Sequence, residues 1–102
     1  MKKIIGGKKY DTETAKQLAE SWNGLSPTDF KYEKEYLYKK KTGEFFLYGE
    51  GGAMSKYAES NGDNTWSSGE NIVPVDEKRA KSWCETHLSA DEYEEIWGEV
   101  EE

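Results

Sequence analysis

The stretch Phe30–Gly52 constrains the fold more than any other part of the chain. In its first half the aromatic residues share one parity and mostly charged residues share the other, a period of two that is typical of a β-strand with one buried face. Its second half, Glu44–Gly49, is apolar on both faces, and Gly43 between them can adopt the positive φ of a tight turn. The stretch therefore predicts an antiparallel hairpin whose aromatic side is half-buried. The aromatic residues of its first half are Phe30, Tyr32, Tyr36 and Tyr38.

The segment before this hairpin predicts one strand and one helix. Lys2–Ile5 is a short strand that Gly6 and Gly7 end. A helix is then expected from Asp11 or Thr12 to Asn23, with Gly24 as its C-cap. It has apolar residues at positions i, i+3, i+4 and i+7, which form one stripe on a helix. These residues are Ala15, Leu18, Ala19 and Trp22.

The segment after the hairpin predicts a short helix, a short strand and two C-terminal helices. We expect a short helix over Ala53–Glu59, with Met54, Tyr57 and Ala58 directed inward, and then a polar loop over Ser60–Asn71. The strand Ile72–Val75 contains Pro74, which belongs at a sheet edge. Asp76 caps a helix over Glu77–Leu88, and Ser89 with Glu92 forms a capping-box pattern that opens the last one. The inward stripe of this last helix is Tyr93, Ile96, Trp97 and Val100.

Together these elements predict one small α+β domain over residues 1–102. Its antiparallel sheet of about 3–4 strands would be built on the central hairpin, with an N-terminal helix and two C-terminal helices. The last of these is an acidic helix over residues 90–102. No apolar run approaches the length of a transmembrane helix, and the N-terminus does not resemble a signal peptide. The single Cys84 cannot form an internal disulfide, which favours a reducing cytoplasm.

The negative charge is concentrated at one end of the chain. The net charge is −7, and residues 91–102 hold seven acidic residues and no basic one, so the rest is neutral. Phosphates would be repelled, so we expect no direct nucleic-acid binding. The asymmetry favours a partner protein with a basic surface. On a helix, the acidic residues form a stripe that can imitate a nucleic-acid backbone in a cationic channel, although a solvated helix face is the commoner explanation. The candidate partner-binding residues are Asp91, Glu92, Glu94, Glu95, Glu99 and Glu102.

Aromatic residues of the hairpin and of the polar loop are a second set of candidates for partner binding, namely Tyr36, Tyr38, Tyr48 and Trp66. The run Lys39–Lys41 and the pair Lys8-Lys9 lie near these tyrosines, an arrangement that would suit single-stranded nucleic acid. Lysines that prevent aggregation at a strand edge are the more common explanation.

No motif predicts catalysis, a metal or a cofactor. Cys84 and His87 lie three residues apart on one helix, but both fall on its predicted core face, so a buried thiol beside a boundary histidine is the favoured interpretation. Two such ligands cannot build a structural zinc site. Gly49-Glu50-Gly51-Gly52 lacks the spacing of a phosphate loop and fits a tight turn or close backbone packing. The 21 acidic residues mark no particular acid–base pair. We expect a protein that is not an enzyme.

Three segments carry a family resemblance: IIGGKKYDTETA from Ile4, YLYKKKTGEFFLYGEGG from Tyr36 and ADEYEEI from Ala90. They resemble a family of proteins of roughly a hundred residues from phages and mobile elements of Firmicutes. Some members with the same opening and hairpin are similar to anti-CRISPR proteins directed at type II, Cas9-type effectors. The resemblance covers nearly the whole chain and implies a function class, without functional residues.

The sequence therefore leaves two main hypotheses and a third, less favoured one. The first is a stoichiometric inhibitor that binds a basic groove of an RNA-guided nuclease. The second is a phage-encoded interaction module or regulator that contacts another host protein through its aromatic hairpin or through the loop of Trp66. The third is a small enzyme that uses Cys84. A homodimer through an edge strand is compatible with the first two hypotheses.

Overall fold

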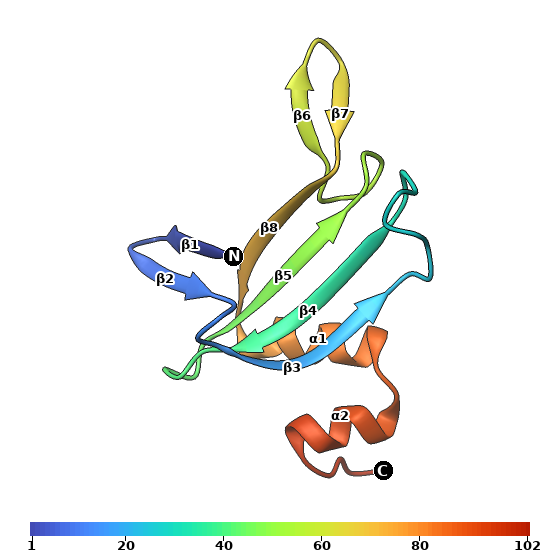
Figure 1. Ribbon diagram of the computed structural model, residues 1–102. Coiled ribbons are helices and arrows are strands. Elements are labelled where there is room, and N and C mark those ends of the chain that lie inside the picture. Colours follow the sequence, from blue (N-terminus) through green and yellow to red (C-terminus); the bar gives the residue numbers. More distant parts are fainter.

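The computed structural model describes all of residues 1–102 as an α+β fold of eight strands and two C-terminal helices (Figure 1). Every strand pairing is antiparallel. The elements are β1 (Lys2–Ile5), β2 (Lys8–Asp11), β3 (Lys16–Trp22), β4 (Glu33–Lys39), β5 (Phe45–Gly51), β6 (Glu59–Gly62), β7 (Thr65–Ser67), β8 (Gly69–Val75), α1 (Glu77–His87) and α2 (Ala90–Trp97).

A four-stranded sheet in the order β3-β4-β5-β8 is the centre of the fold. The predicted hairpin is its β4–β5 pair, and Gly43 in the connecting turn has a φ of +93°. The first strand of this hairpin, β4, starts at Glu33 and not at Phe30 as expected, because residues 26–32 form hydrogen-bonded turns. Pro74 lies on β8, an edge strand, as predicted.

The expected N-terminal helix is absent, and this prediction was wrong. Asp11 ends β2, and Lys16–Trp22 forms β3 at the open edge of the sheet. The helix-like spacing has a different cause, because a β-bulge between Gln17 and Ala19 lets the adjacent Leu18 and Ala19 both pack on the core. Trp22 does not join them and is 57% exposed.

One face of the sheet packs against the helices and holds the larger core cluster. Strand residues of this cluster include Leu37, Leu47 and Val75, and α1 contributes Trp83 and Cys84. The sequence predicts that only the aromatic side of β4 is buried, but the opposite side of this strand is buried more deeply. Leu37 and Glu35, on the side predicted to be charged, are 0% and 3% exposed, while Tyr36 and Tyr38 on the aromatic side are half-buried.

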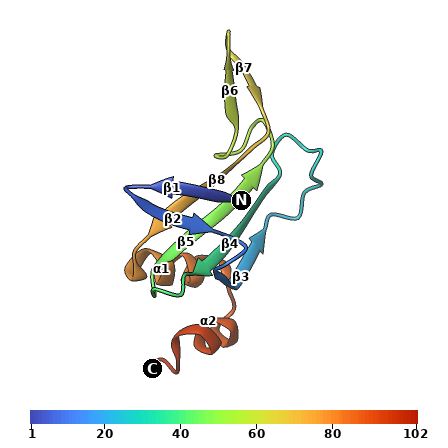
Figure 2. The same ribbon diagram turned by 60° about the vertical axis from the view of Figure 1, so that its left-hand side comes forward.

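The β1–β2 hairpin covers part of the opposite face (Figure 2). Tyr10 of β2 contacts the ring of Phe46 edge-on, with ring centroids 5.6 Å apart. Tyr38 stacks on the same Phe46 ring, with ring centroids 5.1 Å apart. Phe46 is consequently fully buried, and the two faces of the sheet each have a core of their own.

Both C-terminal helices begin at the predicted caps. The Asp76 side chain accepts a hydrogen bond from the Arg79 amide, and Ser89 and Glu92 form the capping box. Helix α2 ends at Trp97, where Gly98 has a φ of +92°, so it is shorter than the expected helix over residues 90–102. Val100, predicted to be part of its apolar stripe, is 56% exposed.

Two connections between β5 and β8 also differ from the predictions. Residues 53–58 form turns in place of a helix, with Tyr57 buried and Met54 65% exposed. The expected polar loop contains the β6–β7 hairpin, which projects from the end of the sheet (Figure 1). Neither helix is long and apolar enough to cross a membrane.

Candidate functional site

The C-terminal acidic segment, residues 91–102, is held to the helix-covered side of the sheet by aromatic contacts. The Trp97 ring lies 5.2 Å from the Phe45 ring, and the Lys81 ammonium lies 5.2 Å from the Trp97 ring centre. Tyr93 and Ile96 also pack against the core cluster, as predicted. The apolar face of α2 therefore points inward and leaves its carboxylates on the outer side.

None of the seven carboxylates of this segment forms an ion pair within the protein. Two of them nevertheless have structural roles. Glu92 accepts from the Ser89 amide, and its hydrogen bonds with the backbone and side chain of Ser89 lower its pKa. Glu94 accepts from the amide of Val100 at 2.8 Å and holds the chain that leaves the helix.

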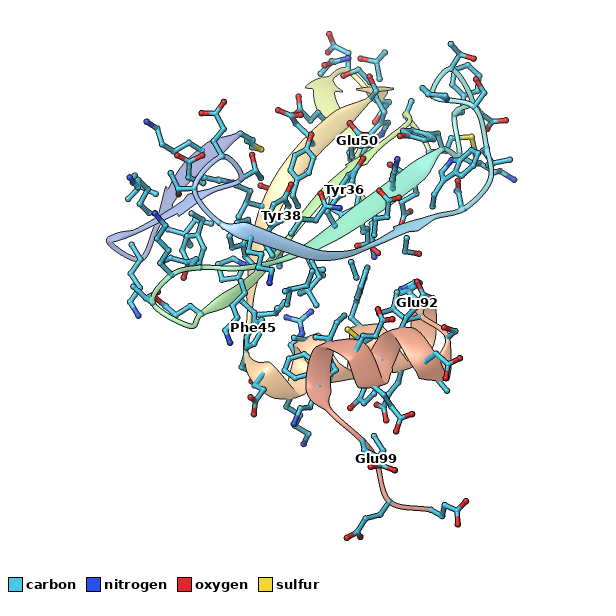
Figure 3. The ribbon with its side chains drawn as sticks, turned by 60° about the horizontal axis from the view of Figure 1, so that its bottom comes forward. Tyr36, Tyr38, Phe45, Glu50, Glu92 and Glu99 are labelled. Carbon is cyan, nitrogen blue, oxygen red and sulfur yellow. The ribbon has the colours of Figure 1, made fainter.

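The structure divides the predicted acidic stripe into two parts. Asp91, Glu92, Glu94 and Glu95 lie on α2, whereas Glu99 and Glu102 lie on the non-helical chain beyond Gly98 (Figure 3). The stripe is therefore not one continuous rod. Asp91, Glu95, Glu99 and Glu102 are exposed and accept no hydrogen bond from the protein, so they are the members free to contact a partner.

The structure brings three of the four candidate aromatic residues onto one face of the sheet, opposite the helices. Tyr36 and Tyr48 are cross-strand neighbours whose rings stack 5.7 Å apart. Tyr38 stacks on Phe46 in the cluster that the β1–β2 hairpin covers, so it has a structural role. Trp66 lies apart from all three, on β7 of the projecting hairpin, where it is 58% exposed.

Two carboxylates beside these tyrosines were not singled out by the sequence analysis. Glu50 on β5 and Glu70 on β8 are directly opposite each other in the sheet register. The Tyr32 hydroxyl donates to Glu50 at 3.0 Å, and the Tyr48 hydroxyl donates to Glu70 at 2.6 Å. Neither carboxylate has a cationic partner. In the sequence, nothing marks these two glutamates. They can be placed on the same face as Tyr36 and Tyr48 only once the strand register is known.

A third carboxylate, Glu35, is buried on the helix-covered face and is fully engaged. Its two oxygens accept from the Tyr57 hydroxyl, from Lys56 Nζ at 3.0 Å and from Trp83 Nε1 at 3.2 Å. Burial by itself would raise the pKa of Glu35, but these three hydrogen bonds outweigh it and hold the pKa below its usual value.

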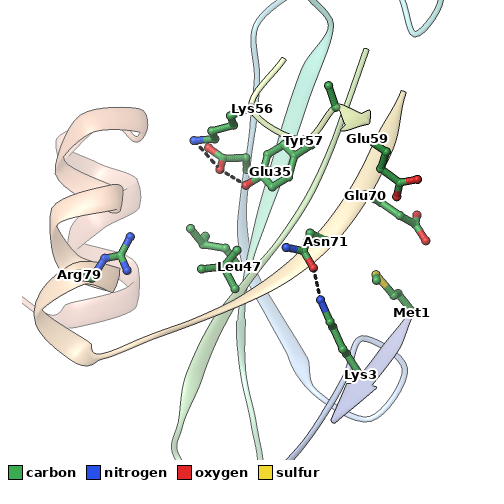
Figure 4. Close-up of a pocket in the computed structure, with 12 residues that line it drawn as sticks. Met1, Lys3, Glu35, Leu47, Lys56, Tyr57, Glu59, Glu70, Asn71 and Arg79 are labelled. Atoms are coloured by element: carbon green, nitrogen blue, oxygen red, sulfur yellow. Dashed lines mark hydrogen bonds and ion pairs between the residues drawn. The ribbon is translucent and has the colours of Figure 1, made fainter. Parts of the chain in front are cut away.

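Glu35 also contributes to a cleft of about 550 Å³ that is lined by the sheet, α1, the turn at residues 53–58 and, from the N-terminus, Met1 and Lys3 (Figure 4). The cleft is lined by charged groups of both signs, including Lys56, Glu59, Glu70 and Arg79. Because the carboxylate of Glu35 is already saturated with donors, it is suited to structural support of this cleft and not to proton transfer.

Cys84 and His87, the pair considered for catalysis, have structural surroundings. Cys84 is 0% exposed in the core, and burial raises the pKa of its thiol. His87 lies at the end of α1, with Nδ1 3.1 Å from the Ser21 hydroxyl and Nε2 3.9 Å from Glu35. Neither Ser21 nor His87 lines the cleft. No three His, Cys, Asp or Glu side chains converge as metal ligands would.

The glycine-rich exit of the hairpin is explained by close packing. A Cβ at Gly49 would lie 1.9 Å from the Tyr57 ring, and one at Gly52 would lie 2.4 Å from the Asp29 carbonyl oxygen. The lysines near the hairpin tip are also engaged. Lys8 and Lys40 both pair with Glu44, at 3.0 and 3.2 Å, and their hydrogen bonds lower the pKa of Glu44 to about 2.

Comparison with known proteins adds no assignment, because no protein-family model, curated protein or solved structure matches the chain. The candidate surfaces therefore depend on the geometry above.

Proposed function

We propose that this protein is a non-enzymatic inhibitor of an RNA-guided CRISPR nuclease of the type II, Cas9-type class. It would act in a bacterial host by placing its C-terminal acidic segment in a basic groove that normally holds nucleic acid. The resemblance to phage and mobile-element proteins similar to anti-CRISPR proteins supports the class of target. The observation that carries the mode of binding is that none of the carboxylates of residues 91–102 forms an ion pair within the protein.

The anchoring of α2 favours this mode of binding over that of a flexible acidic tail. Contacts of Trp97 with Phe45 and Lys81 hold the helix, so its carboxylates are presented by a surface that is already ordered. Pre-organisation reduces the conformational entropy lost on binding. Long-range attraction to a cationic groove would accelerate association and would be screened by salt.

A cleavage assay with matched variants tests this proposal. A panel of Cas9-type nucleases with guide RNA is given a linear DNA target, with and without a molar excess of the protein, at low and high salt. We expect inhibition that weakens at high salt. Full cleavage by every nuclease would reject the proposal.

The variant Asp91→Asn, Glu95→Gln, Glu99→Gln tests the contact surface, because these three side chains have no structural hydrogen bonds. A control with Glu13→Gln, Glu59→Gln and Asp63→Asn removes the same charge from exposed positions elsewhere. We expect the first variant to lose at least tenfold in inhibitory potency and the control to lose less than twofold. Equal potencies would place the interface elsewhere.

The second candidate function is an interaction module for another host protein, and the exposure of Trp66 on the projecting hairpin favours it. A large aromatic residue that is 58% exposed at such a position is suited to protein contact. Affinity capture from host lysate with wild-type protein and a Trp66→Ala variant tests this alternative. A specific partner other than a nuclease that is lost with Trp66→Ala would support it.

A further inference from the structure

The uncovered half of the sheet face opposite the helices contains an ordered strip of aromatic and acidic side chains. We define the tyrosine–glutamate strip as Tyr36 on β4, Tyr48 and Glu50 on β5, and Glu70 on β8. The β1–β2 hairpin covers the neighbouring cluster around Phe46 but leaves Tyr36 outside it. The two tyrosine rings remain half-exposed and stacked.

The arrangement of the two carboxylates is unfavourable for the isolated protein. Like charges directly opposite each other on neighbouring strands are destabilising, and Glu50 and Glu70 are such a pair. Lys34 is the cross-strand neighbour of Glu50 on β4, but its ammonium lies 3.7 Å from Glu20 and 5.2 Å from the centre of the Tyr36 ring, so its ion pair is on the β3 side. Glu50 and Glu70 therefore form no ion pair within the chain, although Glu70 also lines the neighbouring cleft with Lys3, Lys56 and Arg79.

The tyrosine hydroxyls hold these carboxylates in place without saturating them. Tyr32 donates to Oε1 of Glu50, and Tyr48 donates to Oε2 of Glu70. Glu50 Oε2 and Glu70 Oε1 have no hydrogen-bond donor in the protein. A hollow of about 400 Å³ lies beside them and is lined by Tyr32 and by a third carboxylate, Glu59. This hollow contributes no basic side chain of its own.

Among possible occupants, an arginine side chain satisfies these groups best. Its planar guanidinium carries five donors, can bond two carboxylate oxygens at once and stacks on aromatic rings. A nucleic acid would also stack on tyrosines, but its phosphates would be repelled by Glu50, Glu59 and Glu70. We propose that the tyrosine–glutamate strip is a docking site for an arginine-bearing segment of a protein partner.

This site lies on the opposite side of the sheet from the C-terminal acidic segment, as the positions of Tyr36 and Glu50 relative to Glu92 show (Figure 3). It would bind such a segment whether or not the partner is a nuclease. The protein therefore presents two acidic surfaces, which one flat partner surface cannot contact together.

Binding of a defined probe tests the strip. The probe is a synthetic twelve-residue peptide of alternating arginine and glycine, titrated at low salt into the full-length ¹⁵N-labelled protein. We expect saturable amide shifts on β4, β5 and β8 around the strip. We also expect an affinity at least threefold higher than that of the lysine–glycine counterpart. Absence of saturable shifts on these strands, or equal affinity for the lysine peptide, would overturn the proposal.

Matched variants separate the strip from the other acidic surface. The double substitution Glu50→Gln, Glu70→Gln retains the tyrosine hydrogen bonds and removes both charges, and we expect it to lose at least tenfold in affinity for the arginine peptide. The variant Asp91→Asn, Glu95→Gln, Glu99→Gln is expected to lose less than twofold. The reverse order would assign arginine binding to the C-terminal segment and overturn the proposal for the strip.

Discussion

Carboxylates on the two faces of the central sheet are in opposite situations. On the helix-covered face, Glu35 is 3% exposed and accepts hydrogen bonds from Lys56, Tyr57 and Trp83. On the other face, Glu50 and Glu70 lie opposite each other and neither forms an ion pair. The fold thus supplies donors where burial requires them, because an unpaired buried charge is costly. Its uncompensated charges remain at surfaces where a partner can reach them.

If this comparison is correct, removing Glu35 has the largest effect on stability. Glu35→Ala leaves the Trp83 N–H and the Tyr57 hydroxyl without an acceptor, and we expect a loss of about 3 kcal/mol in the free energy of unfolding. Urea denaturation followed by tryptophan fluorescence measures it. Glu33→Ala is the control, since Glu33 pairs with the same Lys56 at 3.5 Å but its side chain is 29% exposed. We expect that control to cost less than about 1 kcal/mol, and equal losses would contradict a special role for Glu35.

The support of Glu35 by Tyr57 depends on the absence of a side chain at position 49. In Gly49→Ala the new Cβ would lie 1.9 Å from the Tyr57 ring, so the ring must move away from Glu35. We expect a loss of about 2 kcal/mol from overpacking. In a double-mutant cycle with Tyr57→Ala, the double variant should lose clearly less than the sum of the two single losses. Additive losses would show that Gly49 acts independently of Tyr57.

Local patterns in the sequence were sufficient for the hairpin and the C-terminal helices. The turn at Gly43 and the caps at Asp76 and Ser89 depend on neighbouring residues, and all three are where the sequence predicts them. The segment Lys16–Trp22 was assigned incorrectly because a β-bulge produces two adjacent inward residues, Leu18 and Ala19, which a helix also does. The bulge forms against β4 and has no local signature.

The candidate sites were less predictable than the fold. The sequence predicts Glu35 on a strand but places Glu50 in a glycine-rich turn and Glu70 in a polar loop, so only the strand pairing of the structure distinguishes them. Glu35 faces Trp83 from a distant helix, whereas Glu50 meets Glu70 because β8 returns beside β5. The clustering of acidic residues near the C-terminus, by contrast, is visible from composition alone, although the end of α2 at Trp97 is not.

The state of Glu35 also predicts a pH dependence of stability. The pKa of Glu35 is lowered in the folded protein. Its ionised carboxylate therefore contributes fully to the free energy of unfolding above the pKa of the unfolded chain, about 4.3, and this contribution is lost as the pH falls through the lower folded pKa. The difference in unfolding free energy between wild type and Glu35→Gln should therefore be constant from about pH 6 to 5 and shrink below about pH 4. Comparing the two proteins cancels the contribution of Glu44, which titrates in the same acidic range. A difference that grows on acidification would contradict the lowered pKa.

The smallest expected effect has the opposite sign and tests the other face. Glu50→Gln removes the repulsion from Glu70 while its side-chain oxygen can still accept from Tyr32, so we expect the protein to gain a few tenths of a kcal/mol in stability. The gain should disappear in 1 M salt, where the Debye length is about 3 Å. Glu20→Gln, on the same face but beside Lys34, should give no gain. A loss of more than about 0.5 kcal/mol in Glu50→Gln would mean that the pair supports the fold, and the contrast between the two faces would then fail. A gain would mean that the chain keeps a destabilising charge at the strip, as expected of a surface shaped for a partner.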